Sequence, residues 1–513
     1  MGNEGSLGIT RRGFLGRAGL LTGAGVFSAA RAGAATADAP PSIVLIQADD
    51  LGYSDLSCYG QKRFDTPHVD RLAADGTRFT AHYAGSPVCA PSRCALLTGL
   101  HTGHSHIRAN DELPDRGDVW NDPSLEGQRP LPAGAETVGT VLKAAGYDTA
   151  IVGKWGLGGP GSDGEPNRHG FDHAFGFLCQ RQAHNHYPDH LWRNGRRVAL
   201  DNPPFRAHQR FPADADPRDA RAYDRYRGRQ YAHDVIMDEA IAWVRDRGTR
   251  PFFLHLTPTI PHLALQVPED ALAAFGGRFR ETPYLGDKGY LPHRAPRAAY
   301  AAMIARLDAG VGRLMRTLAE TGLDARTLVM FTSDNGATFE TGGYDTRFFA
   351  SNAPWRGAKQ DLYEGGIRVP FIARWPGRVP KGIVRHEPCA AWDLAATFAD
   401  LAGTRPPRRH DGVSLRPLLE GRPAAARPPL YWEYLGRQAV RDGRWKGLLD
   451  AETDAFELYD LEADPGERRN VAGVHGEVKA RLRRLMRDSR VESPLFPLLK
   501  PGPGTPGERG DRG

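Results

Sequence analysis

The chain has few cysteines, few lysines and, after its first 35 residues, no long hydrophobic run. Without a run of about 20 apolar residues, a protein with several membrane-spanning helices is excluded, and no stable membrane anchor is expected. Five cysteines in 513 residues are too few for a disulfide-stabilised scaffold, although individual disulfide bonds stay open, and their spacing matches no zinc-binding pattern. They are Cys58, Cys89, Cys94, Cys179 and Cys389.

The positive charge is carried almost wholly by arginine, since only nine of the 67 basic residues are lysine. The arginines are scattered among 61 acidic residues and form no basic block with aromatic residues, so nucleic-acid binding is not expected despite a net charge of +6. Because the chain uses arginine where charge alone is needed, each lysine is a candidate for a site that needs a compact, titratable ammonium group. The 40% hydrophobic content is enough for a packed core.

The N-terminus has the order of features found in an export signal. An arginine pair within Thr10-Arg-Arg-Gly-Phe-Leu-Gly16 precedes a weakly apolar stretch, Gly19 to Ala30, and a small-residue cleavage site, Ala32-Gly33-Ala34. We predict a twin-arginine export signal over residues 1–34, with the twin-arginine export machinery as a partner and an extracytoplasmic location, periplasmic or secreted, in a bacterium. The alternative is a flexible tail in an arginine-rich protein.

Short apolar runs alternate with helical patterns along most of the chain. Runs of this length that are apolar throughout are typical of parallel strands buried on both faces. We therefore expect an α/β fold over residues 40–405, with a large, mostly parallel sheet sandwiched by helices. Strands are expected at 42–47, 149–152, 252–256, 328–331 and 371–374, and helices at 67–75, 136–145, 230–247 and 297–320.

The pattern changes after about residue 405. Short strand candidates separated by turn residues predict a small antiparallel sheet, and a helical pattern follows them. We expect a smaller C-terminal α+β domain over 425–492 and a disordered, Pro/Gly-rich tail over 497–513. The strand candidates are 430–434, 438–441, 445–449 and 456–459, and the helix is 475–488.

Polar residues follow four of the strands expected in the large sheet. In open α/β sheets the ligand site lies beyond the carboxyl ends of the strands, so we expect these side chains to meet at one edge. They are Asp49, Asp50, Lys154, His262, Asp334 and Asn335.

A short motif at Cys89-Ala-Pro-Ser-Arg93, followed by Cys94-Ala-Leu-Leu-Thr-Gly99, resembles the modification motif of the type I sulfatases, C-x-P-S-R. The other motifs of that family appear in the family's order. Taken singly, several also fit turns or a packed histidine, but together they identify the chain as similar to the formylglycine-dependent, arylsulfatase-like sulfatases of the alkaline phosphatase superfamily. The motifs are Asp49-Asp50, Gly153-Lys-Trp155, Pro261-His262, Ser333-Asp-Asn-Gly336, Trp355-Arg-Gly-Ala-Lys359 and Tyr363-Glu-Gly-Gly-Ile-Arg-Val-Pro370.

The resemblance implies hydrolysis of a sulfate monoester, an aryl sulfate or a sulfated carbohydrate, to an alcohol and sulfate. It implies that a formylglycine-generating enzyme converts Cys89 into formylglycine. One hydroxyl of the hydrated aldehyde would attack sulfur to form a sulfoenzyme intermediate, and the other would later expel sulfate.

The resemblance also implies a role for each motif residue. Arg93 would hold the formylglycine hydroxyl and the metal-site carboxylates. Lys154 and Lys359 would bind sulfate oxygens, and His262 or Lys359 would protonate the leaving group. The metal ligands would be hard oxygen donors, which suit Ca²⁺ better than Mg²⁺. The metal ligands would be Asp49, Asp50, Asp334, Asn335 and residue 89.

One position departs from the family's pattern. Most relatives carry His two residues after the motif lysine, where this chain has Gly156. His184, His186 or a water molecule are candidates to replace that imidazole, and the two histidines are otherwise candidates to line the substrate site.

The loops at 100–110 and 158–189 are rich in His, Arg and Asn, which favours a sulfated sugar over a steroid sulfate. Two alternatives stay open. One is a phosphonate or phosphate monoester hydrolase of the same superfamily. The other is an inactive protein that binds sulfated glycans and keeps Cys89 unmodified.

Overall fold

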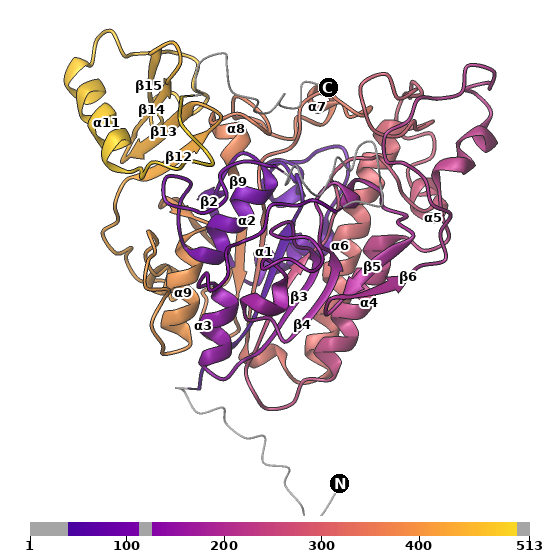
Figure 1. The fold of residues 1–513 in the computed structure, drawn as a ribbon, viewed down its shortest axis with the longest axis horizontal. Coiled ribbons are helices and arrows are strands. Elements are labelled where there is room, and N and C mark those ends of the chain that lie inside the picture. The colour runs from indigo at the N-terminus through magenta and orange to yellow at the C-terminus, as the bar shows by residue number, and fades with distance from the viewer. Residues whose placement is uncertain (1–38, 112–125, 500–513) are drawn as a thin grey trace, which may run out of the picture. The chain divides into compact units, whose positions relative to one another are not determined.

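The apolar runs of the sequence form the centre of a large sheet (Figure 1). The computed structural model describes residues 39–111 and 126–499. The strands of this sheet are β1 (Ser42–Ala48), β2 (Thr77–Tyr83), β3 (Asp148–Lys154), β4 (His173–Phe177), β5 (His190–Arg193), β6 (Arg196–Ala199), β7 (Phe252–Thr257), β8 (Thr327–Ser333), β9 (Arg368–Arg374), β10 (Ile383–Arg385) and β11 (Cys389–Ala390).

Among the described residues the sheet has 11 strands in the order β10-β2-β9-β8-β1-β7-β3-β4-β5-β6, with β11 also beside β2. The five adjacent core strands β8, β1, β7, β3 and β4 are parallel to one another. Strand β9 pairs antiparallel with both β8 and β2, and β5 and β6 form an antiparallel hairpin beside β4. The expected fold, a large and mostly parallel sheet, is confirmed.

Strand β1 shows why the centre of its sequence is apolar. Val44 and Ile46 pack into the core on one face, and Ile43 and Leu45 pack into the core on the other, all with 0% exposure. A strand that is buried on both faces has no position for an exposed polar side chain. The acidic residues Asp49 and Asp50 therefore follow only after the strand has ended at Ala48.

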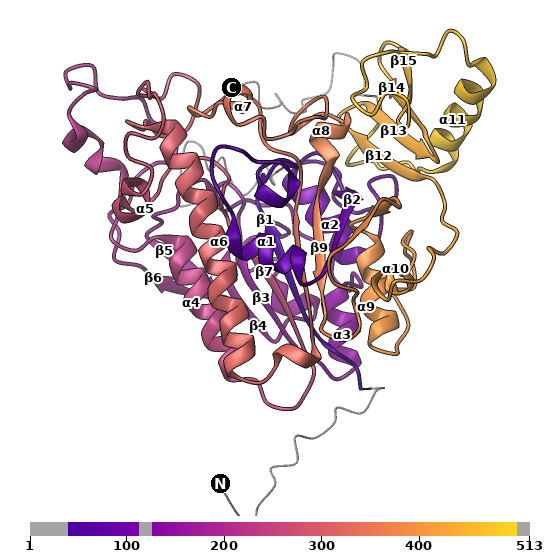
Figure 2. The ribbon, with the colours of Figure 1, turned by 180° about the vertical axis from the view of Figure 1, so that it is seen from behind.

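Helices cover both faces of the sheet (Figures 1 and 2). Residues of α1, α4 and α6 pack into one core, and residues of α2, α3 and α9 pack into the other. The helices are α1 (Pro67–Ala74), α2 (Cys89–Thr98), α3 (Val138–Ala144), α4 (Ala232–Arg245), α5 (Glu269–Ala273), α6 (Pro296–Glu320), α7 (Thr346–Phe349), α8 (Glu364–Ile367), α9 (Asp393–Leu401), α10 (Arg416–Leu419) and α11 (Gly476–Asp488).

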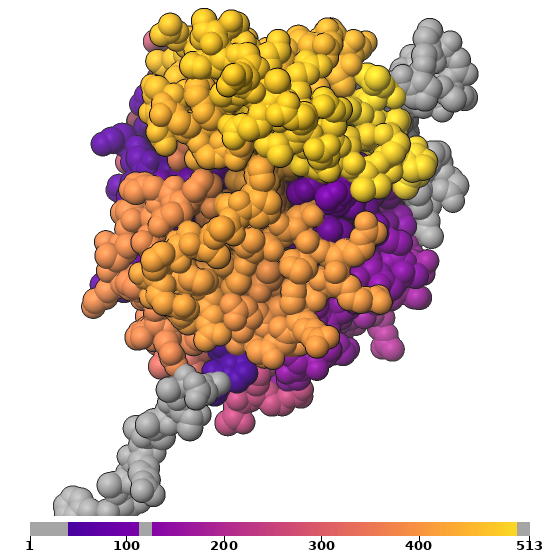
Figure 3. Space-filling model, turned by 90° about the vertical axis from the view of Figure 1, so that its left-hand side faces the viewer, coloured from indigo at the N-terminus to yellow at the C-terminus, as the bar shows by residue number. Residues whose placement is uncertain are grey.

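The C-terminal part of the chain forms the expected four-stranded antiparallel sheet. Helix α11 packs on it through Leu482 and Met486, and Figure 3 shows the face that residues of the last third of the chain build. The described residues of this region belong to the same compact unit as the large sheet. The strands are β12 (Leu430–Tyr434), β13 (Arg437–Asp442), β14 (Trp445–Asp450) and β15 (Phe456–Asp460).

Two expectations concern segments beyond the described residues. The export signal predicted for 1–34 and most of the tail predicted for 497–513 lie outside them, so both stay predictions. Within the described part of the chain, no helix has the length and apolar character needed to cross a membrane.

Candidate active site

The polar residues that follow the central strands meet at one edge of the large sheet, as the sequence predicts. The backbone N–H of Asp50, after β1, donates to Asp334 Oδ1 at 3.1 Å, and the backbone N–H of Asp334, after β8, donates to the carbonyl oxygen of Ala48. Asp49 pairs with Pro261, which precedes His262, and Lys154 at the end of β3 reaches Asp49. The parallel order of β3, β7, β1 and β8 therefore brings these side chains together.

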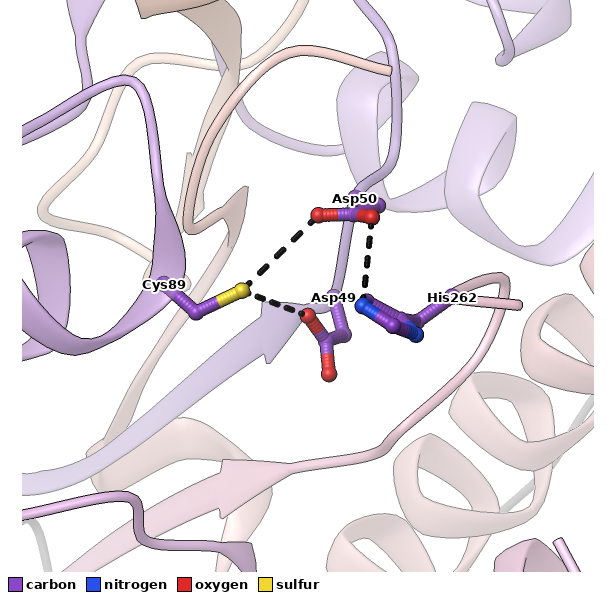
Figure 4. Close-up of side chains that lie close together, drawn as sticks. All are labelled: Asp49, Asp50, Cys89 and His262. Carbon is purple, nitrogen blue, oxygen red and sulfur yellow. Dashed lines mark hydrogen bonds and ion pairs between the residues drawn. The ribbon is translucent and has the colours of Figure 1, made fainter. Parts of the chain in front are cut away.

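Cys89 enters this cluster from the first turn of α2 (Figure 4). Its Sγ lies 3.5 Å from Asp49 Oδ1 and 3.9 Å from Asp50 Oδ1. All ten residues of α2 are buried, and the hydroxyl of Ser92 donates to the carbonyl oxygen of Asp334, which fixes the helix against the β8 loop. Burial raises the pKa of the Cys89 thiol, so the unmodified side chain stays protonated.

Each nitrogen of the Arg93 guanidinium has a protein partner. Its Nε and Nη2 donate to Asp334 Oδ2 at 3.1 and 2.7 Å, and its Nη1 donates to the carbonyl oxygen of Lys154 at 2.9 Å. Its Nη2 also lies 3.8 Å from Asp49. Two hydrogen bonds from one guanidinium to one carboxylate orient both groups. Arg93 therefore fixes the Asp334 carboxylate relative to the end of β3.

The two motif lysines each pair with one aspartate. Lys154 Nζ lies 2.7 Å from Asp49 Oδ2, and Lys359 Nζ lies 2.9 Å from Asp50 Oδ2. Burial alone would raise the pKa of Asp49, but the charges of Lys154, Arg93 and Lys359 lower it to about 2. Asp49 is therefore ionised at neutral and mildly acidic pH.

The donor set fits a hard divalent cation. Ligand atoms of Asp49, Asp50, Cys89 and His262 lie within 4.8 Å of one another. Asn335 Oδ1 is buried and has no hydrogen-bond partner among the described residues, while its Nδ2 donates to Asp50 Oδ1 at 2.7 Å. A buried carbonyl oxygen without a partner is costly, and a cation bound beside the carboxylates would satisfy it.

The three candidate histidines lie at different depths in the site: His262, His184 and His186. His262 is 2% exposed, and its Nε2 lies 3.2 Å from Lys359 Nζ and 3.5 Å from Asp50 Oδ2. The ring of His184 stacks on that of His262 with centroids 4.7 Å apart, so it borders the site. His186 lies behind His262: its Nε2 bonds to the His262 carbonyl oxygen and its Nδ1 to Thr259, which favours a positioning role over substrate contact.

Neither His184 nor His186 lies in the space that a side chain at position 156 would enter. A Cβ on Gly156 would lie 2.7 Å from Cγ of Gln180, so the Gln180 side chain fills that space. Gln180 Nε2 donates to Asn110 Oδ1 at 3.2 Å, and the same oxygen accepts from the backbone N–H of Ala90 at 2.9 Å. No sequence pattern indicates this role for Gln180, because only the folded 158–189 loop brings it beside the end of β3.

A second His/Asp cluster, His101, His104 and Asp411, is explained by hydrogen bonding. His104 Nδ1 lies 2.8 Å from Asp411 Oδ1, and His101 Nδ1 accepts from the backbone N–H of Gly103. His101 must then carry its proton on Nε2, which faces Asp411 at 3.5 Å. A metal-bound imidazole instead donates through its second nitrogen, so this cluster is not assigned as a metal site.

The sequence matches known families over most of its length. The Sulfatase family model matches residues 41–404, and the model described as N-sulphoglucosamine sulphohydrolase, C-terminal, matches residues 357–492. N-acetylgalactosamine-6-sulfatase of Canis lupus familiaris is 33% identical over 470 residues, which cover 88% of this chain and 79% of that protein. Arylsulfatase A of Homo sapiens is 34% identical over 493 residues, 87% of each chain.

Solved structures share the architecture. Ps i-CgsB in complex with k-i-k-neocarrahexaose has a TM-score of 0.70 and 28% identity, over 88% of this chain and 93% of that chain. Phosphonate monoester hydrolase of Agrobacterium radiobacter has a TM-score of 0.61 at 24% identity, over 88% and 95% of the two chains, which is a likeness of fold alone. The match of one family model to most of the chain, together with these relatives, shows that the protein belongs to the sulfatase family and is a sulfuric ester hydrolase.

Proposed function

We propose that this sulfatase uses formylglycine made from Cys89, together with Ca²⁺, to remove sulfate from a sugar. The observation that carries the proposal is the contact of the Cys89 side chain with Asp49 and Asp50, each of which is paired with a lysine. The two lysines beside this contact supply positive charge near position 89, which an anionic ester needs.

Two groups would complete this site. Formylglycine at position 89, in its hydrated form, would supply an oxygen nucleophile that the Cys89 thiol cannot replace. Ca²⁺, with Mg²⁺ as the second choice, would be held by oxygen atoms of Asp49, Asp50, Asp334 and Asn335 and would supply positive charge.

The two lysines have N–H bonds to spare for the sulfate oxygens. An ammonium group has three N–H donors. Lys154 uses one on Asp49, and Lys359 uses two, on Asp50 and His262. Arg93 binds Asp334 and the chain instead, so we assign it to holding the carboxylates and the residue-89 hydroxyl in place.

The hydrogen bonds of His262 indicate where the proton for the leaving oxygen starts. His262 Nδ1 lies 2.5 Å from the carbonyl oxygen of Leu263 and therefore carries the ring proton. Nε2 then accepts from Lys359 at 3.2 Å. Burial and the charges of Lys359 and Lys154 lower the pKa of His262 well below its ordinary value. Because the ring is neutral, the proton comes from Lys359, and His262 orients it.

A sugar is the substrate class that best suits the relatives and the loops. The dog relative is named for N-acetylgalactosamine 6-sulfate, and Ps i-CgsB binds a neocarrahexaose. The predicted export signal suits an enzyme that meets such polymers outside the cytoplasm. We further propose that a formylglycine-generating enzyme and the twin-arginine machinery act on the chain before it works there.

Paired substrates test the reaction class. We expect kcat/KM of the converted enzyme to be higher for 4-nitrophenyl sulfate than for 4-nitrophenyl phenylphosphonate. Lys154→Ala should lower the sulfatase value by about 100-fold or more, because a preorganised donor to the sulfate is lost. The exposed Lys381→Ala is the matched control. Preference for the phosphonate would support the rival, a phosphonate monoester hydrolase. An enzyme that hydrolyses aryl sulfates but no sulfated mono- or oligosaccharide would contradict the proposal of a sugar substrate.

A further inference from the structure

Tyr290, which belongs to none of the sequence motifs, borders the site. Its ring centroid lies 6.1 Å from that of His262, 5.3 Å from that of His184 and 4.6 Å from that of His208. Tyr290, His184 and His208 are partly exposed, whereas His262 is buried. These three rings, here named the aromatic wall, therefore stand between the buried charged cluster and solvent.

The backbone of Tyr290 is held in an uncommon conformation. Its φ of 60° is left-handed, which is rare for a bulky residue and persists where the surroundings enforce it. The backbone N–H of Tyr290 donates to His208 Nδ1 at 3.0 Å. A Cβ on Gly342 would lie 2.9 Å from Tyr290 Cδ2 and 2.8 Å from Leu263 Cδ1, so only glycine at 342 leaves room for the ring.

The wall differs in charge from the cluster beside it. Burial lowers the pKa of His208 to about 4 and that of His184 well below its ordinary value, and burial raises the pKa of Tyr290. All three rings are therefore neutral near pH 7. The groups that attract an anion begin next to the wall: Lys359 contacts His262, whose ring stacks on His184, and Lys154 pairs with Asp49.

An ester placed with its sulfate between the lysines would direct the rest of the molecule toward these rings. A flat ring face packs well against neutral aromatic side chains. A branched or flexible chain would gain less from such a surface.

We propose that Tyr290, His184 and His208 form the subsite for the leaving group, and that this subsite binds a six-membered ring, either a pyranose or an arene, by its face. The inference rests on the proposed function, because it assumes that sulfate binds between the two lysines.

Binding to the unconverted enzyme separates the ring from the sulfate. Full-length protein made without the converting enzyme keeps the Cys89 thiol and cannot turn over, so titration calorimetry in the presence of Ca²⁺ reports affinity alone. The probes are methyl sulfate, which has no ring, phenyl sulfate and galactose 6-sulfate. We expect Tyr290→Ala to weaken binding of at least one ring ester about 10-fold and to leave methyl sulfate unchanged, whereas Tyr290→Phe keeps the ring and the affinity.

Gly342→Ala is a second variant that displaces the Tyr290 ring without removing it, and the same ring-selective loss is expected. Thermal midpoints of the three variants show whether each is folded. Equal losses for methyl sulfate and the ring esters would overturn the subsite and make Tyr290 a support for Lys359. Unchanged binding of both ring esters in Tyr290→Ala would overturn it as well. If the wild type instead binds methyl and phenyl phosphonates more tightly than the sulfates, the proposed function fails. The subsite is then still tested by whether Tyr290→Ala weakens binding of phenyl phosphonate but not of methyl phosphonate.

Discussion

At the scale of single residues, Gly156 and Gln180 explain how the site can lack the imidazole that most relatives have. The Gln180 side chain fills the space in front of Gly156, and its Oε1 is buried without a hydrogen-bond partner among the described residues. Asn110 links its Nε2 to the backbone N–H of Ala90, next to Cys89. An amide can orient a hydroxyl group but cannot act as a base near neutral pH.

This arrangement makes a prediction about exchanging the two side chains. Gln180→Ala should lower kcat roughly 10-fold with little change in KM, because an orienting group is lost. Gly156→His alone should be destabilised, since its Cβ would meet Gln180 Cγ at 2.7 Å. In the double variant the clash with Gln180 is gone and only the left-handed φ of 76° at position 156 still costs stability, so activity should recover, with a new fall of kcat at acidic pH.

The measurement is kcat and KM against pH for the three variants, with the exposed Gln230→Ala as the control. A Gln180→Ala enzyme with the wild-type rate, or a double variant no better than Gln180→Ala, would show that Gln180 does not replace the imidazole.

At the scale of elements, a buried ionic cluster connects the C-terminal sheet to the loop that precedes β9. Lys446 on β14 is 0% exposed and lies 2.9 Å from Glu364 and 2.8 Å from Glu467. Glu364 begins α8, and the carbonyl oxygen of Gly366 in that helix accepts from the backbone N–H of Gly336, directly after Asn335. The C-terminal sheet thereby supports the end of β8.

Removing the charge of this lysine should destabilise the protein. Lys446→Met leaves the buried Glu467 without its cation and Glu364 with Arg368 alone, and the free energy of unfolding should fall by about 3 kcal/mol. Denaturant titration of Lys446→Met beside the exposed Lys381→Ala measures the effect, and the control should change by less than about 0.5 kcal/mol. Equal stability of the two variants would mean that the cluster does not tie the elements together.

The sequence predicts the elements whose pattern is local and misses those that depend on distant partners. The sequences of β1 and β8 predict buried parallel strands, because helices cover both faces of the sheet at these strands. Strand β2, Thr77–Tyr83, is not among the expected strands, because it lacks the continuous apolar run of the core strands and its partners β9, β10 and β11 lie far along the chain. The motif residues could be assigned from strand ends, whereas Gln180 and Tyr290 depend on the fold of irregular loops.

At the scale of the whole molecule, one buried carboxyl group should make stability depend on pH. Burial raises the pKa of Asp55 from 3.8 to about 6, although Tyr300, Ser351 and the backbone of Gly52 donate to it. The folded protein therefore holds this proton more tightly than the unfolded chain. The stabilisation is complete below about pH 4 and is lost as pH rises to about 6.

Asp55→Asn should remove this dependence. Relative to wild type, the variant should gain up to about 3 kcal/mol between pH 4 and pH 7, from a shift of about two pKa units. Unfolding midpoints across this range test the prediction, with the exposed Asp65→Asn as the control. Parallel profiles for wild type and Asp55→Asn would contradict it.

Binding of a cation should also stabilise the whole molecule, since the folded state gathers Asp49, Asp50 and Asp334 in one buried place. At a Ca²⁺ concentration about 100-fold above Kd the gain is about 2.7 kcal/mol. Chelation should therefore lower the thermal midpoint of the wild type, and re-addition of Ca²⁺ should restore it. The midpoint of Asp334→Asn should respond less, and a wild-type midpoint that ignores chelation would count against the metal site.

The central claim is that Cys89 becomes the reactive group of a sulfatase. Mass spectrometry of the peptide that contains residue 89, from protein purified from its native host, tests it most directly. We predict an aldehyde at position 89 that reacts with a hydrazine reagent. A free thiol at position 89 in that material would contradict the mechanism and favour a protein that binds sulfated glycans without hydrolysing them.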